Sequence, residues 1–326
     1  MRNSRSSRRF KPYDLVNIKV KLRDHKYVLS RFLIARQLTQ TLIPSTAATT
    51  IANHLKKQLV DTRKVSITQH ELEQYLFDMM REYGFGRLFA DRFLVLTAFH
   101  QSRTPLVIFI AGINGIGKSF LATQLAERLN LPHVVQTNTV LALMEELEMI
   151  RGPSNQQIVQ DTLPVDTVVV SDDQGVAMLV EQPDRTDMAD LTDFRKDCAR
   201  VRASLADDIR KTLAEGKPII FEGPHIDPDL YTDLIDHSDA AVAFFVLHID
   251  PDRYQQLADR LPSTLDSIHT SGTAIAVQDR LERAARRMML PLISLDERRD
   301  SEILDEMHVH VLKQIEHAVG RKLVSR

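Results

Sequence analysis

A complete phosphate-binding loop lies near the middle of the chain. The apolar run LVIFIA at 106–111 leads directly into GINGIGKS at 112–119, which fills every position of the pattern G-x-x-x-x-G-K-[ST]. Glycines are needed in such a loop because its backbone N–H groups must converge on phosphate oxygens between a buried strand and a helix N-terminus. The chain is therefore expected to contain an α/β domain that binds a nucleoside triphosphate.

Each position of the loop has a predicted role in binding ATP and Mg²⁺. Lys118 is expected to reach the β- and γ-phosphates, and the hydroxyl of Ser119 is expected to ligate Mg²⁺. The predicted nucleotide-binding residues are Gly112, Asn114, Gly115, Ile116, Gly117, Lys118, Ser119 and Phe120. A loop that binds nucleotide without catalysing a reaction has the same pattern, and this alternative stays open.

The composition indicates what kind of molecule the chain binds. The chain has 326 residues, of which 43% are hydrophobic and 26% charged, so it is long enough and apolar enough for a sizeable core. Its 42 basic and 44 acidic residues give a formal net charge of -2, and no global basic field indicates a nucleic acid or membrane partner. Its apolar runs are shorter than the roughly 20 residues that span a bilayer. The expected partner is a small molecule, and the oligomeric state is not indicated.

The single cysteine and the first residues bear on the cellular compartment. Cys198 has no partner for an internal disulfide, which favours a reducing compartment and predicts a cytoplasmic protein. Residues 1–13 are basic and contain no acid, and we expect them to form a short disordered tail. Organelle transit segments begin with a similar composition, so targeting stays open as a second interpretation.

Two domains are expected. Residues 14–100 change from a strand-like alternation to helical periodicity, which predicts a small α-rich domain. Its helices are expected near 30–42, 46–59 and 69–82. After a linker at 102–105, residues 105–326 alternate apolar strands with helices, a pattern typical of a mainly parallel sheet flanked by helices. The expected strands are 106–111, 133–136, 218–222, 241–248 and 290–293, and the clearest helix is 193–215, with Cys198 on its apolar face.

Further polar residues lie where a parallel sheet positions its ligands. Glu222 ends a predicted strand, and we expect it to face Mg²⁺, the attacking group or a water, although a carboxylate there also caps turns. Kinases bring arginines to the transferring phosphoryl group from a mobile lid. The predicted lid arginines are Arg253, Arg260, Arg280 and Arg283. Solvated helix faces carry similar runs of arginine, so that interpretation stays open as well.

Three further segments resemble a known family. The residues LAEG at 213–216, PIIF at 218–221 and EGPHIDP at 222–228 follow one another, and the last is similar to a Glu-Gly-x-His-x-x-Pro signature. With the phosphate-binding loop, they make most of 28–326 resemble the 2-phosphoglycerate kinase family. The segment VLSRFLIARQL at 28–38 is similar to the first helix of that family's ATP-cone-like domain. The resemblance implies ATP-dependent conversion of 2-phosphoglycerate to 2,3-bisphosphoglycerate.

The resemblance also indicates where substrate binds. It implies substrate contacts for Thr137, Asn138 and His225, although a histidine at 225 also suits a role in stabilising the loop. The family usually has Asp at the position of Asn138, and an asparagine donates and accepts hydrogen bonds but accepts no proton at neutral pH. In the N-terminal domain, residues 22–25 read LRDH where ATP-cones favour Lys-Arg-Asp-Gly. We therefore expect a single nucleotide site per chain.

The sequence thus predicts an ATP-dependent small-molecule kinase. In this interpretation the γ-phosphoryl group passes in line from Mg-ATP to a hydroxyl of a small phosphorylated acid, most simply 2-phosphoglycerate. Two alternatives stay open. One is a regulatory P-loop nucleotide-binding protein without kinase activity, with Asn138 marking the lost chemistry. The other is a kinase that acts on another phosphorylated metabolite, such as a polyol phosphate.

Overall fold

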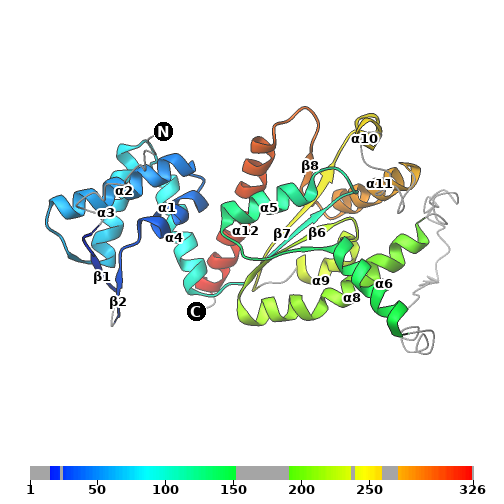
Figure 1. Cartoon of the computed structure of the whole chain (residues 1–326), viewed down its shortest axis with the longest axis horizontal. Helices are drawn as coiled ribbons and strands as arrows, with labels where there is room; N and C mark the ends of the chain where they lie inside the picture. The colour runs from blue at the N-terminus through cyan, green and yellow to red at the C-terminus, as the bar shows by residue number, and fades with distance from the viewer. Residues whose placement is uncertain (1–14, 23–24, 152–190, 236–238, 259–270, 325–326) are drawn as a thin grey trace, which may run out of the picture.

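The computed structural model describes residues 15–22, 25–151, 191–235, 239–258 and 271–324 (Figure 1). The predicted basic tail at 1–13 and the predicted lid residue Arg260 lie outside these ranges. Among the residues that the structure describes, no helix combines the length and the apolar surface that crossing a membrane requires.

A five-stranded parallel sheet forms the centre of the larger part of the molecule. Its order is β5-β6-β4-β7-β8, and every neighbouring pair is parallel. All positions of the central strand β4 are buried, as its continuous apolar sequence requires. The strands are β4 (Leu106–Ala111), β5 (Val134–Gln136), β6 (Pro218–Gly223), β7 (Ala241–His248) and β8 (Leu292–Ser294). The predicted α/β class with a mainly parallel sheet is confirmed.

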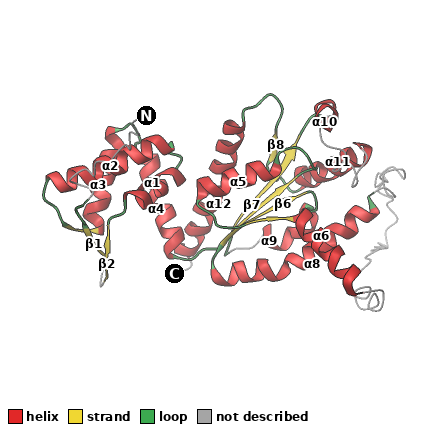
Figure 2. Cartoon of the chain, in the orientation of Figure 1, coloured by secondary structure: helices red, strands yellow, loops and turns green. Residues whose placement is uncertain are grey.

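Helices cover both faces of this sheet (Figure 2). One face carries α5 (Lys118–Leu129) and α12 (Asp300–Val324), and the other carries α8 (Thr192–Glu215) and the short α9 (Thr232–Ile235). The long helix predicted at 193–215 is α8, and Cys198 is fully buried on its apolar stripe. Burial raises the pKa of the Cys198 thiol well above its ordinary value, so this thiol is a packing group.

Three further helices flank the loops at the carboxyl ends of the strands. They are α6 (Thr137–Arg151), α10 (Pro251–Ala258) and α11 (Ser271–Arg287). A 3₁₀ turn, η3 (Pro228–Tyr231), follows β6. The expected strand at 290–293 begins two residues late, because the N–H of Leu290 still bonds to the carbonyl of Ala285 at the end of α11.

The N-terminal part contains a small mixed sheet and four helices. The sheet has the order β2-β1-β3, with β1 antiparallel to β2 and parallel to β3. Its elements are β1 (Lys19–Leu22), β2 (His25–Val28), β3 (Ser66–Thr68), α1 (Arg31–Gln40), α2 (Ser45–Asp61), α3 (Gln69–Glu82) and α4 (Arg87–Gln101). The three predicted helices are present, whereas β2, β3 and α4 were not predicted. The ATP-cone-like description of this part stays a prediction.

The two parts have separate hydrophobic cores that meet at α4. Phe93 belongs to the N-terminal core, whereas Leu96 and Phe99, one and two turns later, belong to the core of the large sheet. A buried side chain adds a polar connection, since Nε2 of Gln40 donates a 2.7 Å hydrogen bond to the carbonyl of Leu129 at the end of α5. The division into domains at 100–105 stays a prediction.

Candidate active site

The phosphate-binding loop leaves the carboxyl end of β4 and ends at the first turn of α5. Gly112, Gly115 and Gly117 have backbone φ values of 152°, 82° and 90°, which residues other than glycine seldom adopt. Gly117 is the N-cap of α5, so the free N–H groups of the first helical turn face the loop. Loop amides and helix N-terminus together favour a phosphate group at this position.

Lys118 is buried inside the loop that it follows. Its ammonium group donates a 2.6 Å hydrogen bond to the carbonyl of Ile113, and only 5% of the residue is exposed. Burial lowers the pKa of Lys118 to about 8, and the nearby carboxylate of Glu222 acts in the opposite direction. The loop therefore holds a desolvated cation that bound phosphate oxygens would stabilise further.

Glu222 lies next to the loop because of strand register. It is opposite Ile110 in the β4–β6 pair, one position before the last residue of β4, and it is 3% exposed. The hydroxyl of Ser119 donates a 2.6 Å hydrogen bond to Oε1 of Glu222. A hydroxyl and a carboxylate are thus adjacent at the edge where parallel sheets bind ligands.

A second group of predicted residues surrounds the start of the loop after β6. Thr137 is fully buried at the start of α6, and its hydroxyl lies 3.4 Å from Nδ1 of His225. Gly223 has a φ of 148°, and a Cβ at this position would lie 1.7 Å from Oγ1 of Thr137. The close contact between Thr137 and Gly223 therefore requires glycine at 223.

Asn138 connects the two groups. Its Nδ2 donates a 2.9 Å hydrogen bond to Oδ1 of Asn114 in the phosphate-binding loop. Asn138 is exposed, whereas the preceding Thr137 is buried. The structure thus brings together Lys118, Ser119, Glu222, Thr137, Asn138 and His225 at the carboxyl edge of the sheet.

The described arginines of the predicted lid bond to different parts of the protein. Nη1 of Arg253 donates to the carbonyl of Leu295 at 2.8 Å and lies 3.4 Å from Asp296. Arg283 lies on an exposed face of α11, 3.9 Å from Asp279. Arg280 instead forms an ion pair with the buried Asp227, with Nη2 2.6 Å from Oδ2. Arg280 therefore binds a buried acid in this structure, and its predicted place among the lid arginines stays a prediction.

Sequence reasoning missed the role of Asp227. The residue is 1% exposed within a fully buried run at 222–228. A buried acid needs a partner, and Arg280 supplies it, but the burial of this segment is visible only in the structure.

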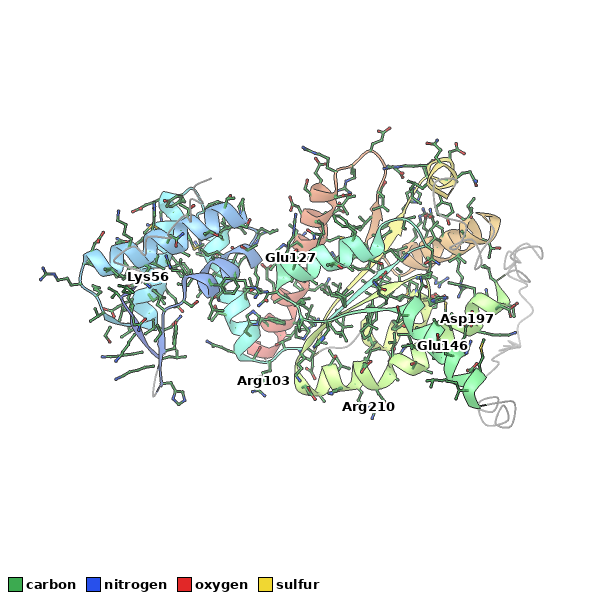
Figure 3. The ribbon with its side chains drawn as sticks, viewed as in Figure 1. Lys56, Arg103, Glu127, Glu146, Asp197 and Arg210 are labelled. Carbon is green, nitrogen blue, oxygen red and sulfur yellow. The ribbon has the colours of Figure 1, made fainter. Side chains whose placement is uncertain are left out.

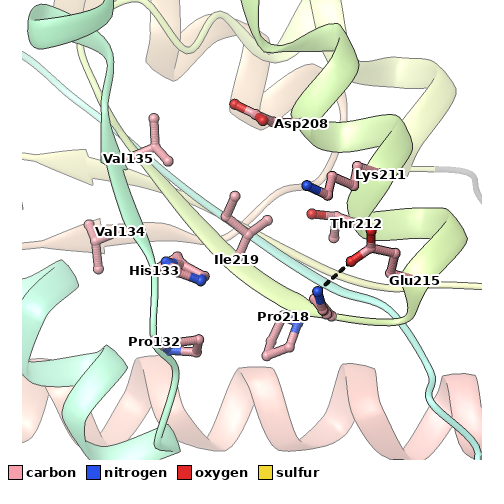
Figure 4. A pocket seen from close by; sticks show the side chains of 11 residues that line it. Pro132, His133, Val134, Val135, Asp208, Lys211, Thr212, Glu215, Pro218 and Ile219 are labelled. Carbon is pink, nitrogen blue, oxygen red and sulfur yellow. Dashed lines mark ion pairs between the residues drawn. The ribbon is translucent and has the colours of Figure 1, made fainter.

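A separate pocket of about 370 Å³ lies at the opposite end of β5 and β6 (Figure 4). His133, Lys211 and Asp208 line it, together with an ion pair between Lys217 and Glu215. Because its residues come from the amino ends of the two strands and from the last turns of α8, this pocket is distinct from the site at the carboxyl edge.

Comparison with known proteins supports one family. A family model described as an AAA domain matches residues 107–261, a range that begins in β4 and includes the phosphate-binding loop. A 2-phosphoglycerate kinase from Pyrococcus horikoshii is 26% identical over 199 residues, 61% of this chain and 61% of the relative. Relatives of the same name from Methanothermobacter thermautotrophicus (29% identical, 67% of this chain and 66% of the relative) and Thermococcus kodakarensis (25% identical, 81% and 86%) also match.

These matches support the 2-phosphoglycerate kinase family for this chain. The chain spans 61% and 66% of the length of the first two relatives, less than two thirds of each. Within the family, the geometry described above locates the residues of the Glu-Gly-x-His-x-x-Pro signature, since Glu222 contacts Ser119 and His225 lies beside Thr137.

Proposed function

We propose that this protein transfers the γ-phosphoryl group of ATP to the free hydroxyl of 2-phosphoglycerate, which gives 2,3-bisphosphoglycerate and ADP. The observation that carries the proposal is the 2.6 Å hydrogen bond between Ser119 and Glu222. It connects a complete phosphate-binding loop to a buried carboxylate at the ligand-binding edge of the sheet.

The nucleotide side of the site is built from the loop and α5. In the proposal, the loop amides and the N-terminus of α5 bind the phosphates, and the ammonium of Lys118 exchanges the carbonyl of Ile113 for phosphate oxygens. Phe120 is 51% exposed in the first turn of α5, where it contributes an apolar surface beside the loop.

The hydroxyl of Ser119 and the carboxylate of Glu222 suit Mg²⁺, because that ion prefers hard oxygen ligands and takes one or two from protein. These two residues are proposed to hold it. When bound, Mg²⁺ neutralises charge on the phosphates.

The acceptor side is built from Thr137, Asn138 and His225. The acceptor hydroxyl oxygen forms a bond to the γ-phosphorus as the bond to the bridging oxygen of ADP breaks, and the hydroxyl proton leaves to solvent or to a basic group. Asn138 is proposed to orient that hydroxyl by hydrogen bonding, since its amide already contacts Asn114 of the loop. His225 is proposed to contact the acceptor's phosphate.

Positive charge near the transferring group is proposed to come from Arg253 and Arg283. Their side chains are 45% and 63% exposed, and to reach phosphate oxygens Arg253 would leave Leu295 and Asp296 while Arg283 would leave Asp279. Arg260 shares this proposed role and lies outside the described residues.

An acceptor screen with γ-labelled ATP tests the proposal. Purified protein is incubated with Mg-ATP and, in turn, 2-phosphoglycerate, 3-phosphoglycerate and a set of polyol phosphates, and labelled products are separated. The proposal expects label in 2,3-bisphosphoglycerate and a product only when acceptor is present. Label in a polyol bisphosphate alone would redirect the substrate assignment, and nucleotide binding without turnover would support a regulatory protein.

A further inference from the structure

The loop after β6 is held at both of its ends. At the near end, Gly223 packs directly against Thr137 at the start of α6. At the far end, Asp227 accepts a 3.2 Å hydrogen bond through Oδ1 from the N–H of Asp229, which caps the 3₁₀ turn η3. His225 lies between these two fixed points and is 3% exposed.

The second oxygen of Asp227 binds a residue from a distant helix. Nε and Nη2 of Arg280 on α11 lie 2.8 Å and 2.6 Å from Oδ2. The carboxylate is almost fully buried and the guanidinium is 22% exposed, so water screens the pair little. The two oxygens of Asp227 therefore bind different elements: Oδ1 accepts from the backbone of η3, and Oδ2 binds Arg280 of α11.

A second ion pair strengthens this connection. Arg287, two turns after Arg280 on α11, pairs with Asp229, and Nη2 of Arg280 also lies 3.6 Å from the Asp229 carboxylate. Two arginines of one helix thus hold two acids of one loop. Because α11 also packs against β7, these ion pairs hold the loop in a fixed position relative to the central sheet.

We propose that Arg280 is a positioning residue that acts through Asp227 to hold His225 in place for the phosphorylated acceptor. The inference rests on the proposed function for the identity of that acceptor. Because His225 is two residues from Asp227 and has Thr137 on its other side, a displaced Asp227 moves the imidazole relative to the phosphate-binding loop. Among the described residues, no hydrogen bond or ion pair joins Asp227 or Arg280 to the phosphate-binding loop or α5, which form the nucleotide half of the site.

The test compares Asp227→Asn, Arg280→Gln and Arg280→Lys with a matched control, Arg210→Gln. Arg210 lies on α8 (Figure 3). It is exposed, and among the described residues its ion pair is with Asp207, one turn earlier on the same helix. Steady-state kinetics should show kcat/KM for 2-phosphoglycerate reduced about 10-fold to 100-fold in Asp227→Asn and Arg280→Gln, mainly through KM. The KM for ATP should stay within about twofold of the wild-type value, because binding at the nucleotide half is unchanged.

Arg280→Lys keeps the charge beside Asp227 and loses one of the two donors, so it should recover part of the acceptor affinity. Arg280→Gln leaves the buried carboxylate of Asp227 unpaired, which can prevent folding. Arg280→Lys keeps a cation beside Asp227, so the test remains informative in that case. An unchanged acceptor KM, or equal losses for ATP and acceptor, would overturn the inference, since equal losses indicate a purely structural role.

Hydrogen–deuterium exchange of the same variants is independent of turnover. Peptides that cover 222–231 should exchange faster in Arg280→Gln while peptides that cover 106–119 keep their protection. Unchanged exchange at 222–231 would overturn the inference whatever the activity. If the wild-type protein shows no acceptor-dependent turnover, the proposed function fails, and the exchange result alone decides whether Arg280 holds this loop.

Discussion

The hydroxyl of Ser119 donates a 2.6 Å hydrogen bond to Oε1 of Glu222, although the two residues are 103 positions apart in the sequence. The contact joins the first turn of α5, which follows β4, to the penultimate residue of β6, the strand paired with β4. It makes Glu222 part of the phosphate-binding region rather than a cap of the following turn, and the first prediction tests what the carboxylate does.

Glu222→Gln should lower kcat while nucleotide affinity stays nearly intact. If the carboxylate acts on the metal or the nucleophile in the transition state, its loss should reduce kcat by about 10²- to 10⁴-fold. Glutamine keeps the shape and still accepts the hydrogen bond from Ser119. The exposed Glu127 on the same helix as Ser119 provides the control Glu127→Gln. A wild-type kcat for Glu222→Gln would remove Glu222 from the catalytic assignment.

Nucleotide affinity should fall as pH rises above about 8. Burial lowers the pKa of Lys118 to about 8, so the neutral amine accumulates as pH increases through that value. Bound phosphates favour the ammonium form and raise this pKa, and binding should therefore take up a proton at about pH 9 but not at about pH 6. Calorimetry in two buffers of different ionisation enthalpy measures this uptake.

Lys118→Arg is the control for the pH prediction, because a guanidinium stays charged throughout this range. Any binding that it retains should show no proton uptake at the higher pH. Equal proton uptake by the wild-type protein at both pH values would contradict the account of a desolvated lysine.

Gly223→Ala should destabilise the protein by more than about 3 kcal/mol, since it adds a clash to backbone strain. The new Cβ would lie 1.7 Å from Oγ1 and 2.9 Å from Cβ of Thr137, at a φ of 148°. Chemical denaturation measures the loss. Removing the hydroxyl with Thr137→Ala should restore part of the stability that Gly223→Ala loses, but it should not stabilise the wild-type chain. Equal effects of Thr137→Ala in both backgrounds would disprove the contact.

Asn138→Asp should preserve or raise kinase turnover. The variant places a carboxylate beside the loop residue Asn114, whose amide presents its NH₂ group after a side-chain flip. In the proposed site, a carboxylate would both hydrogen-bond the acceptor hydroxyl and accept its proton, whereas the amide of Asn138 would only hydrogen-bond it. Asn138→Ala is the matched control and should lower turnover. If Asn138→Asp and Asn138→Ala lose activity equally, Asn138 does not lie beside the acceptor hydroxyl.

One molecule of ATP should bind per chain, and Lys118→Ala should abolish that binding while the fold persists. In the same titration, the exposed Lys211 on α8 offers the control Lys211→Ala, which should bind normally. Thermal melting should show stabilisation by Mg-ATP in the control but none in Lys118→Ala. A second site that survives Lys118→Ala would establish a regulatory site in the N-terminal part.

The elements that sequence reasoning predicted well are those with local signals. The loop spacing at 112–119 and the apolar run before it depend on neighbouring residues only, and both are present in the structure. The helix α12 was not predicted, although it carries such a signal. Its residues Ile303, Met307 and Val311 are spaced four residues apart and are buried.

Sequence patterns of this kind did not predict the contacts between segments that are distant in the sequence. The ion pair of Asp227 with Arg280 joins residues 53 positions apart, and the contact of Gly223 with Thr137 depends on how β5 and β6 align. Helical spacing placed Arg280 and Arg283 on one face of α11 but did not indicate that one binds a buried acid and the other faces solvent.

The most direct test of the proposed function is phosphorus NMR of a reaction that contains Mg-ATP, with and without 2-phosphoglycerate. The account predicts that ADP and 2,3-bisphosphoglycerate appear together in equal amounts, that no ADP forms without acceptor, and that Glu222→Gln shows neither product on the same timescale. ADP formation with inorganic phosphate and no new phosphate ester, or no reaction while Mg-ATP is demonstrably bound, would contradict the kinase assignment.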